Sequence, residues 1–77
     1  MESVYVLIET DSGALENVVA ELRKRAGVKE VNAITGPFDV IVKIETEHIT
    51  EALQTIVHDI RKIKGVKSTE TLVCIKL

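Results

Sequence analysis

The sequence contains few of the residues that cross-link small proteins through disulfides or bind metals. Cys74 is the only cysteine, so the chain cannot form an internal disulfide, and a single thiol is typical of a reducing compartment. His48 and His58 lie ten residues apart with no second cysteine, which matches no recognised zinc-ligand spacing. No apolar run approaches the roughly 20 residues of a membrane span, and the first residues show no signal-peptide pattern. We therefore expect a cytoplasmic protein with no metal, no cofactor and no membrane contact.

A strong charge of one sign is also missing. The 77 residues include 10 Lys and Arg against 12 Asp and Glu, for a formal net charge of −2. Binding to a phosphate backbone requires concentrated positive charge. The one basic run, Arg23-Lys24-Arg25, falls at the end of a predicted helix, where cations complement the helix dipole. We expect no direct contact with nucleic acid.

The apolar pattern predicts six elements in the order strand, helix, strand, strand, helix, strand. Ser12 is a candidate helix N-cap, and Gly27 and Gly65 are candidate helix stops. The predicted strands span residues 3–10, 28–35, 38–45 and 66–77, and the predicted helices span residues 14–26 and 49–63. The second helix is expected to turn one apolar face to the core: Ile49, Leu53, Ile56, Val57, Ile60 and Ile63.

The two halves of the chain resemble each other. Ile8-Glu9-Thr10 recurs as Ile44-Glu45-Thr46, and Gly27-Val28-Lys29 recurs as Gly65-Val66-Lys67. A β-α-β unit used twice predicts an α+β, ferredoxin-like fold in which two helices cover one face of a four-stranded antiparallel sheet. The more apolar strands, 3–10 and 38–45, are expected in the centre, and the polar strand 28–35 at an edge.

The uncovered face of this sheet should be polar if it faces water. One strand parity is apolar and should meet the helices: Val4, Val6, Ile8, Phe38, Val40, Val42, Ile44, Val73 and Ile75. The opposite parity also carries apolar residues, mixed with charged ones: Tyr5, Leu7, Ile41, Leu72 and Cys74. Such a patch is typical of an interaction surface, and a core this small needs outside support because disulfides and metals are excluded. We predict a sheet-to-sheet dimer of the dimeric α+β barrel type. The alternative is that these residues only serve β-propensity on a wet face.

The chain shows no catalytic constellation. Cys74 lies in an apolar stretch, L-V-C-I, which favours a packed residue over a nucleophile. Neither histidine has a carboxylate partner at a spacing that suggests general-base work. We therefore expect a binding or structural protein and not an enzyme.

Two short segments could contact a ligand. In residues 35–39, T-G-P-F-D, Gly36 permits close approach to the backbone, and Asp39 could accept a bond from an ammonium group. In residues 68–71, S-T-E-T, hydroxyl groups could orient a polar ligand. A plain hairpin turn and a plain strand explain these residues equally well.

Both segments carry a family resemblance. Residues 34–45, I-T-G-P-F-D-V-I-V-K-I-E, resemble the G-x-[Tyr/Phe]-D-hydrophobic hairpin of the RAM domain (regulation of amino acid metabolism) of Lrp/AsnC-type, or feast/famine, regulators. The ending of that domain, I-x-x-I-x-G-V-x-x-T-x-T-x-[Val/Ile], is matched from Ile60 to Val73. The resemblance covers essentially the whole chain.

The resemblance implies a dimer formed by the open sheet faces, further assembly into a ring, and small ligands, typically amino acids, bound between dimers. The contacts it implies are Gly36, Phe38 and Asp39, with Thr69 and Thr71. Phe38 stands where tyrosine is common, which removes a hydroxyl contact. The DNA-binding domain of full-length regulators has no counterpart, since Met1 leads almost directly into the first strand.

These features predict one domain, residues 1–77, that binds an effector, oligomerises and modulates the regulation of amino-acid metabolism, with full-length regulators as candidate partners. Three alternatives stay open. An ACT-like module would bind an amino acid near the loop after the first strand. A dimeric α/β-barrel enzyme would hold a cavity between sheet and helices. A ligand-free oligomerisation unit would bind no amino acid.

Overall fold

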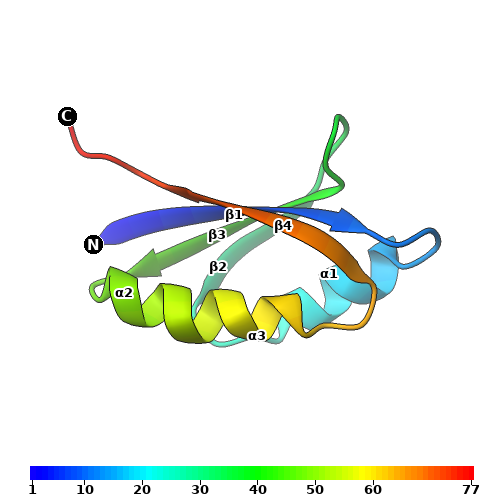
Figure 1. Ribbon diagram of the computed structural model, residues 1–77, viewed down its shortest axis with the longest axis horizontal. Coiled ribbons are helices and arrows are strands. Elements are labelled where there is room, and N and C mark those ends of the chain that lie inside the picture. The colour runs from blue at the N-terminus through cyan, green and yellow to red at the C-terminus, as the bar shows by residue number, and fades with distance from the viewer.

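Two β-α-β units share one antiparallel sheet in the computed structural model, which describes residues 1–77 (Figure 1). The sheet order is β2-β3-β1-β4, so the two central strands and the edge strand β2 are as predicted. The α+β, ferredoxin-like fold class is confirmed. The elements in chain order are β1 (Glu2–Thr10), α1 (Leu15–Arg23), β2 (Val28–Ala33), β3 (Val40–Thr46), α2 (Ile49–Ala52), η1 (Leu53–Val57), α3 (His58–Arg61) and β4 (Val66–Val73).

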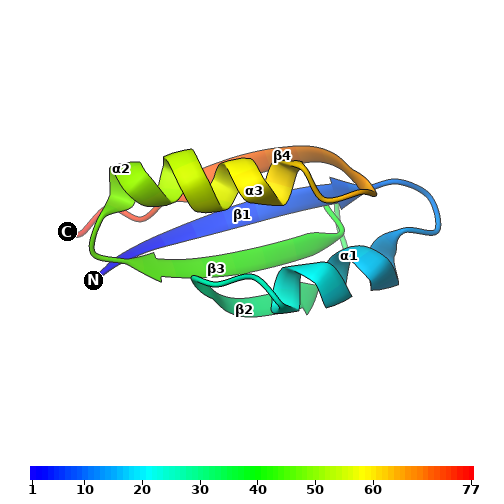
Figure 2. The same ribbon diagram turned by 90° about the horizontal axis from the view of Figure 1, so that it is seen from below.

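Both helical segments lie on the same face of the sheet, as Figures 1 and 2 show. The core lies between this face and the helices. Strands β1 and β3 contribute the predicted parity, which is fully buried: Val4, Val6, Ile8, Val40, Val42 and Ile44. Val18 and Leu22 from α1 and Ile60 from α3 meet them. Burying each such side chain stabilises the fold by about 1.5–3 kcal/mol.

The second helix contains a wide turn. Residues Ile49–Ala52 and His58–Arg61 are α-helical, and Leu53–Val57 between them form a π-helix. The buried residues Ala52 and Val57 are five positions apart, the π repeat, so the wider turn keeps both on the core face. Leu53, predicted to face the core, is instead 37% exposed. No helix is long and apolar enough to cross a membrane.

The start of α1 and the end of β4 differ from the prediction. Ser12 does not cap α1: the N-cap is Ala14 without a side-chain bond, and the Ala14 N–H donates to the Asp11 carbonyl at 3.0 Å. Strand β4 ends at Val73, which pairs with Val4, and a bond from the Cys74 N–H to the Ser3 carbonyl at 3.0 Å follows it. Ile75 is 80% exposed, and Val73 is 45% exposed at the sheet margin. Phe38, in the hairpin before β3, is half-buried outside the core cluster, so none of these three residues packs in the core as predicted.

The glycine that follows the helix in each half lies against the helix of the other half. A Cβ atom on Gly65 would lie 2.7 Å from the Ala14 Cβ, and one on Gly27 would lie 2.5 Å from the Ile56 Cδ1. These reciprocal contacts fit the duplication seen in the sequence. They also require glycine where each helix ends and its following strand begins.

Candidate functional site

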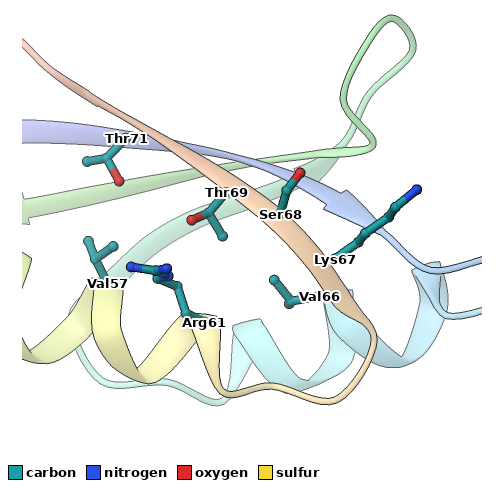
Figure 3. A pocket seen from close by; sticks show the side chains of 7 residues that line it. All are labelled: Val57, Arg61, Val66, Lys67, Ser68, Thr69 and Thr71. Atoms are coloured by element: carbon teal, nitrogen blue, oxygen red, sulfur yellow. The ribbon is translucent and has the colours of Figure 1, made fainter.

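A hollow of about 490 Å³ opens between α3 and the edge strand β4 (Figure 3). Two of the residues that line it, Thr69 and Thr71, are candidate ligand contacts from the sequence analysis. Thr69 pairs with Ile8 and Thr71 with Val6, whose side chains are buried under the helices. Because side chains alternate along a strand, both threonine side chains turn toward the helix layer and into the hollow. The full lining is Val57, Arg61, Val66, Lys67, Ser68, Thr69 and Thr71.

Arg61 is the residue that sequence reasoning missed. It lies four positions after the buried Val57, one helical turn along the same face. Figure 3 shows its guanidinium extending from α3 toward Thr69 and Thr71. Its side chain takes part in none of the hydrogen bonds or ion pairs of the fold, and neither do the hydroxyls of Thr69 and Thr71. The hollow therefore holds one free cation and two free hydroxyls.

The other polar residues of the hollow are engaged elsewhere. The Lys67 ammonium points away from the hollow in Figure 3 and lies 3.8 Å from the Glu9 carboxylate. The Ser68 hydroxyl donates to the same carboxylate at 3.0 Å. No carboxylate lines the hollow, so the charged residues of its lining, Arg61 and Lys67, are both cations.

The predicted hairpin contacts lie on another part of the molecule. Figure 1 shows the connection between β2 and β3 rising on the side of the sheet away from the helices. Gly36 is exposed there, and Phe38 is half-buried. Asp39 is anchored to the end of β1, since its Oδ2 accepts a bond from the Thr10 N–H at 2.8 Å and from the Thr10 hydroxyl at 3.3 Å.

Within one chain the structure does not bring the hairpin and the two threonines together. Val40, the first residue of β3, and Thr69 pair with Ile8 from opposite sides. The intervening strand β1 thus separates them by two strand spacings, about 10 Å. The threonines face the helices, while the hairpin projects the other way.

The open face of the sheet carries the apolar patch that the sequence predicted. Tyr5 lies opposite Leu72, and Leu7 lies opposite Ile41, so these four side chains form a band across β3, β1 and β4. Leu72 is 44% exposed. Cys74, just beyond β4, is also exposed, and its N–H donates to the Ser3 carbonyl at 3.0 Å.

Charged side chains border the apolar band. The Lys43 ammonium lies 3.9 Å from the carboxylates of Glu30 and Glu45 and 6.0 Å from the centre of the Tyr5 ring. A polar rim around an apolar centre is the anatomy of a protein interface.

Known proteins with similar sequences are mostly regulators. An uncharacterised HTH-type transcriptional regulator of Pyrococcus furiosus is 35% identical over 74 residues, which cover 92% of this chain and 49% of that protein. This chain thus spans about half the length of that relative. A homocitrate synthase of Sulfolobus acidocaldarius is 48% identical over 50 residues, 65% of this chain and 10% of the enzyme. That likeness is to one small part of the enzyme.

Solved structures agree on the fold. The crystal structure of FFRP-DM1 superposes with a TM-score of 0.87 at 32% identity and covers 97% of this chain and 100% of its own. A Neisseria meningitidis transcriptional regulator, solved in complex with L-Met, has a TM-score of 0.84 at 17% identity, covering 97% of this chain and 50% of its own. The model of the Lrp/AsnC ligand binding domain matches residues 3–77. The chain therefore belongs to the Lrp/AsnC ligand-binding (RAM) domain family.

Proposed function

We propose that this domain binds an amino acid, and that binding changes the assembly through which it modulates transcriptional regulation of amino-acid metabolism. The observation that carries the proposal is the hollow beside β4, where Thr69, Thr71 and Arg61 present free polar groups in a domain of a ligand-binding family. The L-Met complex of the Neisseria regulator supports the class of ligand. The domain acts by binding and not by catalysis.

The proposed assembly begins with a dimer that buries the open sheet face. Tyr5, Leu7, Ile41, Leu72 and Cys74 would form its shared apolar core, with the charged side chains at its rim. Dimers would then join into a ring. The dimer supplies the apolar burial that a chain of 77 residues is too short to obtain alone.

The effector site would be completed between chains of neighbouring dimers. Gly36, Phe38 and Asp39 of one chain would meet Thr69 and Thr71 of another, because the two groups are too far apart within one chain. The exposed turn would bind the α-carboxylate and Asp39 the α-ammonium group. A ligand shared in this way binds the ring better than the free dimer, and so shifts the population toward the ring.

The regulatory output would pass through shared assembly. Full-length Lrp/AsnC regulators in the cytoplasm carry the same kind of domain, so mixed rings would let the effector act on those regulators. The effector concentration would set the fraction of mixed rings.

A thermal-shift screen against the common amino acids tests the proposal. We expect at least one of them to raise the melting temperature, because a ligand that binds only the folded state stabilises it. Replacing Thr69 and Thr71 with valine should abolish the shift. Thr50→Val, an exposed change on the second helix, should leave it unchanged. A protein indifferent to every amino acid would be a ligand-free oligomerisation unit, and the proposal would fail.

A second candidate is a regulatory domain that acts on a biosynthetic enzyme. It is favoured by the 50-residue likeness to a homocitrate synthase. Adding this chain to an enzyme of that class from which the matching segment has been deleted should then restore a dependence of its rate on an amino acid. An unchanged rate would leave transcriptional regulation as the function.

A further inference from the structure

The two halves of the chain each contain a hollow between a helix and the following edge strand. The first, of about 360 Å³, lies between α1 and β2 and is lined by Leu15, Glu16, Val19, Ala20, Arg23 and Ala33. The second is the hollow beside α3 and β4. An offset of 38 residues, the same that relates Gly27 to Gly65, carries Val19 onto Val57 and Arg23 onto Arg61. The hollows are thus equivalent positions of the duplicated unit.

The equivalent arginines are in different states. An Arg23 Nη donates to the Val31 carbonyl at 3.3 Å, so the first hollow uses its arginine within the fold. Arg61 has no such partner. Equivalent positions of the duplicated unit thus hold one arginine that is hydrogen-bonded within the fold, Arg23, and one that is free, Arg61.

The strand residues beside the second hollow are also more polar than those beside the first. The positions equivalent to Thr69 and Thr71 are Val31 and Ala33. The first hollow is thus mainly apolar, whereas the second offers two hydroxyls beside a free guanidinium. These two changes convert a mainly apolar hollow into one whose guanidinium and hydroxyl groups can donate hydrogen bonds to an anion.

We propose that Arg61 makes the second hollow selective for an effector whose side chain ends in a carboxylate, either an acidic amino acid or the related dicarboxylic oxo acid. This inference rests on the proposed function. There the hairpin holds the α-carboxylate and, where the effector has one, the α-ammonium group, which leaves the effector side chain to reach Thr69, Thr71 and Arg61. A guanidinium binds a carboxylate through two parallel hydrogen bonds, and the hydroxyls can donate to the same oxygens.

The surrounding charges favour an acid over its neutral or basic counterparts. None of the 12 acidic residues of the chain lines this hollow, so no carboxylate of its own walls faces a bound anion. A lysine side chain would be placed against Arg61 and would be rejected. An amide side chain would gain only neutral hydrogen bonds, which are weaker than charge-assisted ones.

Calorimetric titration of the assembled protein tests the selectivity. The ligands are L-glutamate, L-aspartate, their amides L-glutamine and L-asparagine, L-lysine, and 2-oxoglutarate, which lacks the ammonium group. We expect one acid to bind about tenfold more tightly than its amide, since a hydrogen bond to a charged group is worth more than 1 kcal/mol. Tight binding of 2-oxoglutarate would identify the effector as the oxo acid, and its failure beside tight glutamate or aspartate binding would identify the amino acid.

Three arginine variants separate the site from general charge effects. Arg61→Gln should weaken binding of the acid about tenfold and leave binding of the amide unchanged. Arg23→Gln removes the same charge from the equivalent position and should leave both affinities unchanged. Arg61→Lys keeps the charge without the two-pronged geometry and should recover part of the affinity.

Three outcomes would overturn the inference. If an amide, a neutral amino acid or lysine binds as tightly as the acids in a manner that depends on Thr69 and Thr71, the proposed function stands and the role of Arg61 is wrong. If Arg61→Gln binds the acid as well as the unaltered protein does, the same conclusion follows. If no amino acid and no oxo acid binds at all, the proposed function fails together with the inference.

Discussion

At the scale of single residues, Asp39 combines a structural role with a proposed binding role. Its Oδ2 accepts two bonds from Thr10 and so fixes the base of the hairpin to the end of β1. Its Oδ1 takes part in no hydrogen bond of the fold and is the atom left for an ammonium group. The same anchor would hold Gly36 and Phe38 in place for a ligand.

Removing the Asp39 carboxylate should therefore destabilise the fold as well as weaken binding. For Asp39→Ala we expect a loss of about 1–3 kcal/mol in the free energy of unfolding, because the part-buried Thr10 N–H loses its acceptor. Asp11→Ala is the control, since Asp11 is exposed and its side chain makes no hydrogen bond or ion pair. Urea denaturation of both variants at one protein concentration measures the difference. Equal stability of the two would show that the Thr10 bonds contribute nothing.

The sequence could predict some of these residues and not others. Thr69 and Thr71 were predicted because the hydroxyl-rich segment 68–71 and the family motif both point to them. The pairing of Asp39 with Thr10 spans 29 residues, and no local pattern contains it. Arg61 and Arg23 are alike in the sequence, and only the contacts of the folded chain show that one is tied and the other free.

At the scale of elements, the strands were easier to predict than the helices. The period of two in β1 and β3 identified all six buried residues of these strands, because both strands lie in the centre and one face of each is fully covered. The second helix departs from a single period. Its π turn changes the spacing from three or four to five between Ala52 and Val57, so a helical wheel misplaces Leu53.

Truncating Leu53 and a buried residue of the same helix to alanine should change the free energy of unfolding by different amounts. Ile60→Ala should cost about 2–5 kcal/mol, because Ile60 is fully buried and its loss leaves a cavity. Leu53→Ala on the same helix should cost about 1 kcal/mol or less, since Leu53 is exposed at the surface. Thermal or urea denaturation compares the two. A larger loss at Leu53 would mean that the helix follows the ordinary repeat and lacks the π turn.

The contact between the two halves can be tested at Gly65. Its φ is +101°, and an added Cβ would lie 2.7 Å from the Ala14 Cβ and 3.0 Å from the Val18 Cγ2. Gly65→Ala should therefore cost about 2–5 kcal/mol, the sum of backbone strain and overpacking. Gly13→Ala is the control, because Gly13 also has positive φ (+79°) but no atom near its added Cβ; it should cost about 1–2 kcal/mol. Equal losses would remove the case for close packing at Gly65.

At the scale of the whole molecule, the proposed dimer rests on the open sheet face. Leu72→Glu would place an unpaired charge in the proposed dimer core and should raise the dimer dissociation constant about 100-fold or more. Leu53→Glu is the matched control: Leu53 is similarly exposed but lies on the helix layer, so its variant should keep the dimer. Sedimentation of both variants over a range of concentrations gives the two constants. Retention of the dimer by Leu72→Glu would move the interface to another surface.

The central claim is that this chain assembles through its sheet face and that an amino acid changes the assembly. Its most direct test is the solution mass by light scattering, measured with and without a mixture of the common amino acids. We expect at least twice the 8.5 kDa of one chain in both cases, and a larger or more stable assembly when the effector is present. A monomer under both conditions would contradict the account, because the apolar band on the open face would then have no partner to cover it.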